Sequence, residues 1–298
     1  MTAVMKTYLR KHSYLFLLTP PLLVVTIFLL IPLVILIQYS FRTHIPGQGL
    51  KVGFTLVNYA RFVTDPYYLN GLLITLITGL VVVTITLLLA YPVAYFYAKT
   101  RFKHRGLLLI MLLSPFYTNI IIKIFSWMVI LGRQGVINKL LIQFQLLDRP
   151  FEFLYSYIGV IIIMVYVHVP MMALLLIGPI QNIKDSLIES ARICGSTTFG
   201  VTRSIILPLS IPGILSGSII VYTSVIAAFI IPLLVGGDWG KRFISVMMYT
   251  HINVTQNWAF GSAIAMILIV TSLIVVIVTS RIVKSLKVGV LISENFTK

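Results

Sequence analysis

The sequence predicts an all-α integral membrane protein with six transmembrane helices. Of its 298 residues, 59% are hydrophobic and only 10% are charged, whereas roughly a quarter of the residues of a soluble domain are charged. Long segments also lack Asp, Glu, Lys and Arg, such as the 30 residues between Lys11 and Arg42 and the 38 between Arg242 and Arg281. Each can hold the ~20 apolar residues that a membrane-spanning helix needs. These observations argue against a soluble enzyme, a disordered chain and a β-barrel.

The first apolar segment follows Lys6, Arg10 and Lys11 and therefore resembles a signal peptide. Its length, from Tyr14 to Tyr39, exceeds that of a signal-peptide core, and no small-residue cleavage pattern follows. We interpret residues 14–39 as an uncleaved first span.

Five further spans and their connections follow from the remaining apolar segments. The side of the membrane that carries the N-terminus has 14 Lys and Arg residues, against 8 on the other side. The short loop Lys99–Arg105 is the densest cluster. The positive-inside rule then predicts that both termini are cytoplasmic and accounts for most of the net charge of +16. The predicted spans are 72–98, 106–131, 156–180, 211–235 and 259–281. The predicted parts are an N-terminal region (1–70), a core (71–285) and a cytoplasmic tail (286–298).

Few polar groups fall within the predicted spans. Lys123 is the one charged residue away from the span ends, and an intramembrane charge is by default a functional hypothesis. It could line a pathway, bond to a carbonyl at a helix end, or extend to the interface. We expect His168 to be a structural residue bonded to a neighbouring helix. The candidate residues of a substrate pathway are Tyr117, Thr118, Asn119, Lys123, Tyr166, Tyr222 and Asp238.

The segment 181–210 is predicted to form a helix, a break and a second helix outside the membrane. We expect Gly195 to end the first helix and Ser196 or Thr197 to cap the second. Pro208 and Pro212 are expected to stop the helix before the fifth span. One face of the first helix would carry Ile183, Leu187, Ala191 and Cys194, and a partner would meet Phe199, Arg203 and Ile206.

This segment resembles the Glu-Ala-Ala loop of ABC importer permeases, the membrane subunits of binding-protein-dependent transporters. The family pattern is Glu-Ala-Ala, three residues, Gly, nine residues and Ile-x-Leu-Pro. Its positions are occupied here by Glu189, Ser190 in place of the middle Ala, Ala191, Gly195, Ile205, Leu207 and Pro208. Residues 70–285 are also similar to the spermidine/putrescine-type permeases, notably in Leu113–Trp127 and Phe229–Gly237.

The resemblance implies a type I permease fold in the bacterial inner membrane, with the loop docking on a cytoplasmic ATPase dimer. It also implies a second permease subunit, either a related chain or another copy, and an extracytoplasmic solute-binding protein that delivers a polyamine. The chain itself would be no enzyme and would hold no cofactor or metal, since ATP and Mg²⁺ would bind the partner ATPase. We expect contact with the lipid bilayer and none with nucleic acid.

Two alternatives stay open at this point. The same machinery could carry another solute, such as an organic phosphonate, another anion or an amino-acid-like compound. The chain could instead be an ion-coupled secondary transporter, which needs an intramembrane titratable pair or a broken-helix ion site, and only Lys123 and His168 are available for that. The stretch Gly236–Arg242 resembles a phosphate loop, but its spacing excludes nucleotide binding. We expect it to form a turn that faces a partner, with Asp238 near a cationic solute.

Overall fold

A computed structural model describes residues 2–45, 47, 49–51, 53–100 and 102–295, with side chains described from residue 19 to residue 281. Some of the charges behind the predicted orientation lie outside the described side chains: Lys6, Arg10, Lys11, Arg101, Lys284, Lys287, Glu294 and Lys298. The chain forms two compact units, Met1–Thr64 with Thr250–Met266, and Asp65–Tyr249 with Ile267–Lys298.

The first unit joins the long helix α1 (Thr2–Ser40) to a short hairpin and a short helix. Strands β1 (Thr43–Ile45) and β2 (Gly49–Lys51) pair antiparallel, with His44 opposite Leu50. Asn58 of α2 (Val57–Thr64) is buried and donates from Nδ2 to the carbonyls of Ser40 and Arg42. These two bonds fix the end of α1 against α2. The unit also contains the π-helix η2 (Thr250–Val254) and the start of α14 (Trp258–Asn295).

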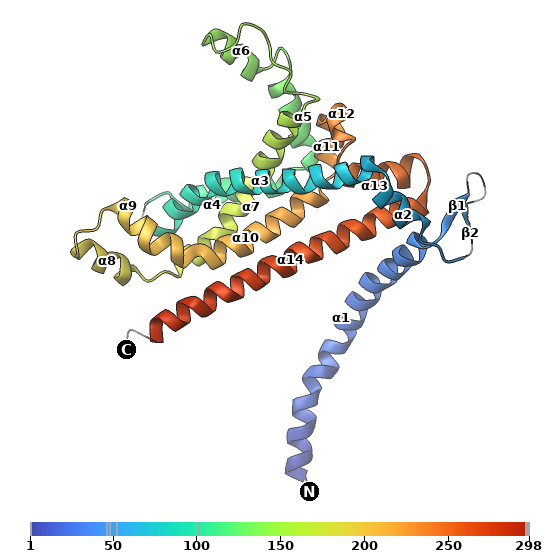
Figure 1. Ribbon diagram of the computed structural model, residues 1–298. Helices are drawn as coiled ribbons and strands as arrows, with labels where there is room; N and C mark the ends of the chain where they lie inside the picture. The colour runs from blue at the N-terminus through green and yellow to red at the C-terminus, as the bar shows by residue number, and fades with distance from the viewer. Residues whose placement is uncertain (1, 46, 48, 52, 101, 296–298) are drawn as a thin grey trace. The chain divides into compact units, whose positions relative to one another are not determined.

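The core of the second unit is a bundle of three helices, α3 (Pro66–Lys99), α7 (Tyr157–Gln181) and α10 (Leu207–Ala227) (Figure 1). Small residues on the buried face of α3 let the helices approach closely, as is common between membrane helices. At Gly79, for example, an added Cβ would lie 2.6 Å from Cε2 of Tyr222 on α10. The close packing of α3 on α10 therefore requires a residue without a side chain at position 79.

Six helical stretches in the described part of the chain are long and apolar enough to cross a membrane, which confirms the predicted number. They are Thr19–Ser40, Pro66–Lys99, Ile120–Gln143, Tyr157–Gln181, Thr198–Ala227 and Trp258–Arg281.

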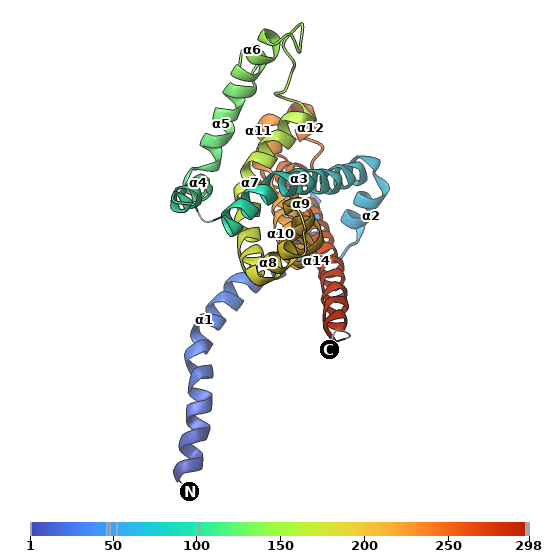
Figure 2. The same cartoon turned by 90° about the vertical axis from the view of Figure 1, so that its left-hand side faces the viewer.

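The predicted third span, 106–131, is not one continuous helix. It is divided into α4 (Arg105–Tyr117) and α5 (Ile120–Leu131), separated by Thr118 and Asn119, and the apolar stretch Ile120–Gln143 begins only at α5. Thr118 is extended, and Oδ1 of Asn119 accepts a bond from the N–H of Ile121 at 2.8 Å. An Asn cap competes with helix continuation, and this explains why an apolar run still breaks. The helix α6 (Val136–Gln143) follows, and α5 and α6 lead away from the bundle (Figures 1 and 2).

The fifth span also differs from the predicted 211–235. Pro208 and Pro212 do not stop the helix, which runs from α9 (Thr198–Val201) through the π-helix η1 (Thr202–Ile206) into α10. In η1 the N–H of Leu207 bonds to the carbonyl of Thr202, five residues back. This wider turn relieves the clash that a proline ring makes with the preceding turn. The span ends at Ala227 and is followed by α11 (Ile230–Val235), α12 (Gly237–Gly240) and α13 (Ile244–Tyr249).

The two ends of α7 define two opposite ends of the bundle. Its C-terminus leads into α8 (Asp185–Ile193) and α9, which lie near the C-terminal end of α3 (Figure 1). Its first residue, Tyr157, lies with its ring 5.7 Å from that of Trp239 in α12. A helix of this length spans about 37 Å at 1.5 Å per residue, close to the thickness of a membrane. The segment with α8 and the turn with α12 are therefore separated by the depth of the bilayer.

Candidate functional site

The segment that connects α7 to α10, residues 182–208, is here called the interhelical segment. Its first helix, α8, ends as predicted at Gly195, which has φ +82°. The N–H of Gly195 bonds to the carbonyl of Arg192 at 2.9 Å and that of Ser196 to the carbonyl of Ala191 at 3.0 Å. This is a Schellman ending, which needs a left-handed residue and favours Gly. Thr197 caps the next helix by accepting from the N–H of Gly200 at 3.2 Å, again as predicted.

Large apolar side chains of this segment are exposed. Leu187, Ile193 and Phe199 are 45%, 87% and 74% exposed, respectively. Leu187 and Ile193 lie outside the six apolar stretches, where exposed apolar residues indicate a protein contact, and Phe199 lies at the start of Thr198–Ala227. Glu189, which matches the Glu-Ala-Ala pattern, and Ser190, which replaces its middle Ala, are exposed between them. The segment therefore exposes large apolar residues together with Glu189 and Ser190.

The predicted faces are buried to different extents. Ala191 of the first face packs on the core together with Ile188, whereas Leu187 and Cys194 are exposed. Ile206 of the predicted partner face is fully buried, so only Phe199 and Arg203 of that face are exposed. The π-helix explains this difference, since its extra residue per turn rotates Ile206 away from the face expected of a regular helix. Of the remaining pattern residues, Ile205 packs on the core, whereas Leu207 and Pro208 are exposed.

The interhelical segment is fixed to α3 by a contact that the sequence analysis missed. Lys99, the last residue of α3, donates from Nζ to the carbonyl of Ile183 at 2.6 Å and to Oδ1 of Asp185 at 2.8 Å. The sequence shows Lys99 only as one charge of a basic loop. No local signal reveals the bonds, because the partners are more than 80 residues away.

The break between α4 and α5 holds most of the predicted pathway residues. Tyr117, Thr118 and Asn119 are exposed there. Lys123 donates from Nζ to the carbonyl of Pro115 at 2.7 Å, the helix-end bond that was one of its three predicted placements. Tyr166 contacts Trp127 at 5.0 Å between ring centres, beside an apolar hollow of about 570 Å³.

Two polar residues of the bundle face its interior. Nδ1 of His168 lies 2.7 Å from the carbonyl of Met164 and Nε2 lies 3.1 Å from Oγ of Ser224 on α10, the interhelical bond expected of a structural histidine. Tyr222 differs from its prediction as a pathway lining: it is 6% exposed and donates to the carbonyl of Leu76 at 3.3 Å. Its polar atom is satisfied by α3, because Gly79 leaves room for the ring.

At the opposite end of α7, aromatic and charged side chains line two adjoining hollows. One, of about 590 Å³, is lined by Tyr155, Asp238, Trp239 and Lys241 among others. The other, of about 380 Å³, shares Tyr155 and Trp239 and adds Arg133 and Glu152. Asp238 pairs with Lys241 at 2.8 Å. This ammonium lowers the pKa of the Asp238 carboxyl, and the carboxylate in turn raises the pKa of Lys241.

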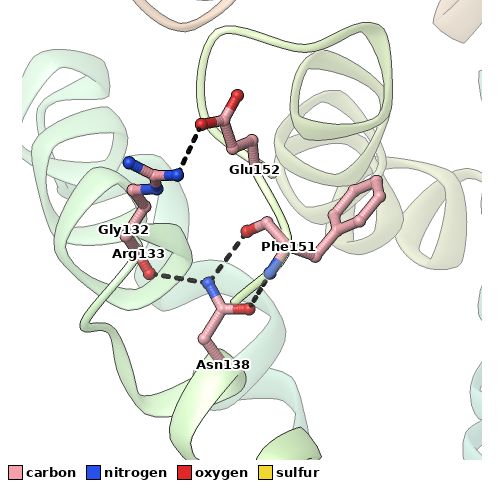
Figure 3. A network of polar contacts seen from close by, with 5 residues as sticks. All are labelled: Gly132, Arg133, Asn138, Phe151 and Glu152. Carbon is pink, nitrogen blue, oxygen red and sulfur yellow. Dashed lines mark hydrogen bonds and ion pairs between the residues drawn. The ribbon is translucent and has the colours of Figure 1, made fainter. Parts of the chain in front are cut away.

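A polar network fixes the loop beside these hollows (Figure 3). Asn138 of α6 is fully buried and donates from Nδ2 to the carbonyls of Gly132 and Phe151 at 2.9 and 3.0 Å. Its Oδ1 accepts from the N–H of Phe151 at 2.9 Å, and Arg133 pairs with Glu152 at 3.0 Å. The network gives the 132–155 loop a defined shape. No local sequence signal points to this role of Asn138.

Residues 87–288 match the family described as the binding-protein-dependent transport system inner membrane component. The chain belongs to this family. It is accordingly a multi-pass permease subunit of an ABC importer in the bacterial inner membrane, as the resemblance of the interhelical segment indicated.

Individual family members resemble the chain over most of its length. The spermidine/putrescine transport system permease protein PotB of Escherichia coli K12 is 33% identical over 80% of this chain and 86% of its own length. The PotB protein of Haemophilus influenzae is 32% identical over 85% and 88%. The trehalose/maltose permease MalF of Thermococcus litoralis is 28% identical over 97% of both chains.

The fold is that of solved permeases. A chain of a bacterial ABC transporter that imports the acidic polysaccharide alginate aligns with TM-score 0.77 and 17% identity, over 94% of this chain and 98% of that one. A chain of a bacterial alginate transporter in complex with its alginate pentasaccharide-bound periplasmic protein aligns with TM-score 0.74 and 19% identity, over 92% and 94%. At these identities the likeness concerns the fold alone.

Proposed function

We propose that this permease forms half of the pathway by which a polyamine such as spermidine or putrescine enters the cell. Identity of about one third to PotB proteins over four fifths of the chain supports the polyamine. In this arrangement the interhelical segment docks on a cytoplasmic ATPase dimer, and the end with α12 faces a solute-binding protein. A second permease subunit, distinct or identical, completes the pathway.

The exposed face of the interhelical segment is the observation that carries the coupling part of this proposal. Leu187, Ile193 and Phe199 offer an apolar contact, and the Schellman ending at Gly195 fixes the angle between α8 and α9. A lever that transmits force needs such a fixed bend. With this segment on the cytoplasmic side, both termini of the chain are cytoplasmic.

The opposite end suits contact with a binding protein. The hollows around Tyr155 and Trp239 open about one membrane thickness from α8. The loop held by Asn138 lies beside them, so its shape is set before a partner arrives. Pre-formed surfaces lose little entropy on binding.

Uptake by the reconstituted transporter tests the proposal. The complete assembly in proteoliposomes, with its binding protein outside and ATP inside, should accumulate labelled spermidine or putrescine. Vanadate should abolish this uptake, because it blocks ATPase turnover.

Three results would contradict parts of it. Accumulation of an organic phosphonate or an amino acid instead of polyamine would contradict the proposed solute and leave the role as an ABC importer subunit unchanged. Uptake that follows an ion gradient without ATP would support a secondary transporter. Purification of the chain without any ATPase subunit from its native membrane would contradict the docking role of the interhelical segment.

A further inference from the structure

Both ends of the interhelical segment are fixed to the same helix, α3. At the start, Nζ of Lys99 bonds to the Ile183 carbonyl and to Asp185. Just beyond the end, in the first turn of α10, the hydroxyl of Ser210 lies 3.1 Å from that of Tyr91. Tyr91 and Lys99 are about 12 Å apart along α3 at 1.5 Å per residue. The segment is therefore held at two points of one helix.

The contact at Lys99 is shielded from water. The Lys99 side chain is 8% exposed, although that of Asp185 is 64% exposed. Its bond to the carbonyl of Ile183, which is itself buried, is charge-assisted and therefore stronger than a neutral bond. By contrast, Arg133 and Glu152 form an ion pair with both side chains at least 70% exposed, and such surface pairs contribute little.

Helix α3 is well placed to receive motion from this contact. It packs against both α7 and α10, and its 34 residues run the full depth of the bundle. α8 itself has no buried residue and rests on the core only through partly buried side chains. A displacement of α8 must therefore either break the bonds of Lys99 or move the end of α3.

We propose that Lys99 is a positioning residue of the transport cycle that transmits movement of α8 to α3. Tyr91 and Ser210 supply the second connection, at the far end of the segment. The proposal rests on the proposed function, in which an ATPase moves the interhelical segment. Without Lys99, α8 is no longer bonded to the end of α3 and can move while α3 stays in place, so ATP hydrolysis continues and less solute is moved per ATP.

The number of solute molecules imported per ATP hydrolysed tests this role in the reconstituted transporter. Lys99→Met should lower this ratio about tenfold or more, since a bond to a charged group contributes on the order of one such factor. Asp185→Asn keeps the bond to the Ile183 carbonyl and should lower the ratio less, by about twofold to threefold. Lys99→Arg, which restores the charge, should recover part of it. Lys103→Met removes an exposed charge from the neighbouring loop and is the matched control, with an unchanged ratio.

A second measurement needs no solute. Spin labels on Cys194 and on a Thr100→Cys variant report the separation of α8 from the end of α3. In the native background this separation should stay constant when ATP and vanadate are added, and in Lys99→Met it should change.

Two outcomes would overturn the proposal. One is a Lys99→Met transporter whose uptake and hydrolysis fall in equal proportion, as expected of a residue that only stabilises the fold. The other is a label separation that stays constant without Lys99. Failure of the proposed function would show differently, as vanadate-insensitive uptake or absence of polyamine uptake by the unaltered transporter.

Discussion

Lys123 on α5 donates from Nζ to the carbonyl of Pro115 on α4 at 2.7 Å, across the break in the third span. The bond joins two helices that the chain itself separates at Thr118 and Asn119. It explains how a charged residue is accommodated within an apolar span. The carbonyls of a helix end lack partners within the helix and carry partial negative charge, so an ammonium group is a suitable partner.

This bond predicts different results for two substitutions of Lys123. Lys123→Met loses a bond worth about 1.5–3 kcal/mol but also removes a charge that costs about 2.5–3.5 kcal/mol in a membrane. The net change in stability should therefore lie between a loss of about 0.5 kcal/mol and a gain of about 2 kcal/mol. Lys123→Glu keeps a charge and places it against a carbonyl, so the melting temperature in detergent should fall by several degrees. Equal destabilisation by both variants would show that the ammonium has a larger role.

The left-handed residue at the end of α8 predicts the behaviour of Gly195 variants. An added Cβ meets no atom within 4 Å, so any effect comes from the backbone or from a partner. Gly195→Val forces a β-branched residue into φ +82°, at a cost of about 1–2 kcal/mol, and should reduce uptake at least tenfold. Gly195→Asn, which tolerates this conformation, should reduce it much less. Membrane fractions of both variants should contain normal amounts of protein, and normal uptake by Gly195→Val would contradict the docking role.

A similar argument applies to Glu189, which is exposed next to the apolar contact residues. Glu189→Lys should abolish uptake while the chain still inserts into the membrane, because it reverses a charge on the surface that we propose to face the ATPase. Uptake is measured together with the amount of ATPase that remains bound to the variant during purification. Full uptake by this variant would show that Glu189 is not part of the contact.

Asn138 predicts a stability effect without a direct role in transport. Asn138→Ala removes the side-chain partner of the carbonyls of Gly132 and Phe151 and of the N–H of Phe151. The expected loss is about 3 kcal/mol, because three hydrogen bonds are lost and each contributes about 1 kcal/mol. Glu152→Gln removes only the exposed ion pair with Arg133 and should cost less than about 1 kcal/mol. Thermal unfolding and protease sensitivity of the 132–155 loop would measure the contrast.

His251 predicts how the first unit responds to acid. Burial, and then the charge of Arg61, lower the pKa of its imidazole below the ordinary 6.5. The folded state then binds a proton less readily than the unfolded state. Neutral His251 therefore makes its full contribution to the stability of the folded state above pH 6.5, and this contribution is lost as pH falls from there through the folded pKa. The melting temperature should fall between pH 7.5 and 5.5, and His251→Gln should reduce this fall. His104→Gln, at an exposed position, is the control.

Features that depend on composition and short spacing could be predicted from the sequence. The six spans follow from apolar length, and Gly195 and Thr197 follow from the local chemistry of helix ends. The interhelical segment was recognised because its pattern residues lie within 20 positions of one another.

Features that depend on contacts between distant residues could not. Lys99 and Asp185 are 86 positions apart, and no local pattern pairs them. The π-helix at Thr202–Ile206 allows the fifth span to continue as a helix past Pro208, because tertiary packing outweighs the local helix-breaking propensity of proline. The break at Asn119 was hidden by the apolar residues on both sides.

The chain contains a single cysteine, Cys194, and it is exposed between α8 and Gly195. A maleimide reagent therefore labels one site of the native sequence without prior removal of other thiols. A fluorophore or cross-linker attached there reports when the interhelical segment is covered and which protein covers it. The natural sequence thus carries its own probe position at the surface where ATP hydrolysis is proposed to meet transport.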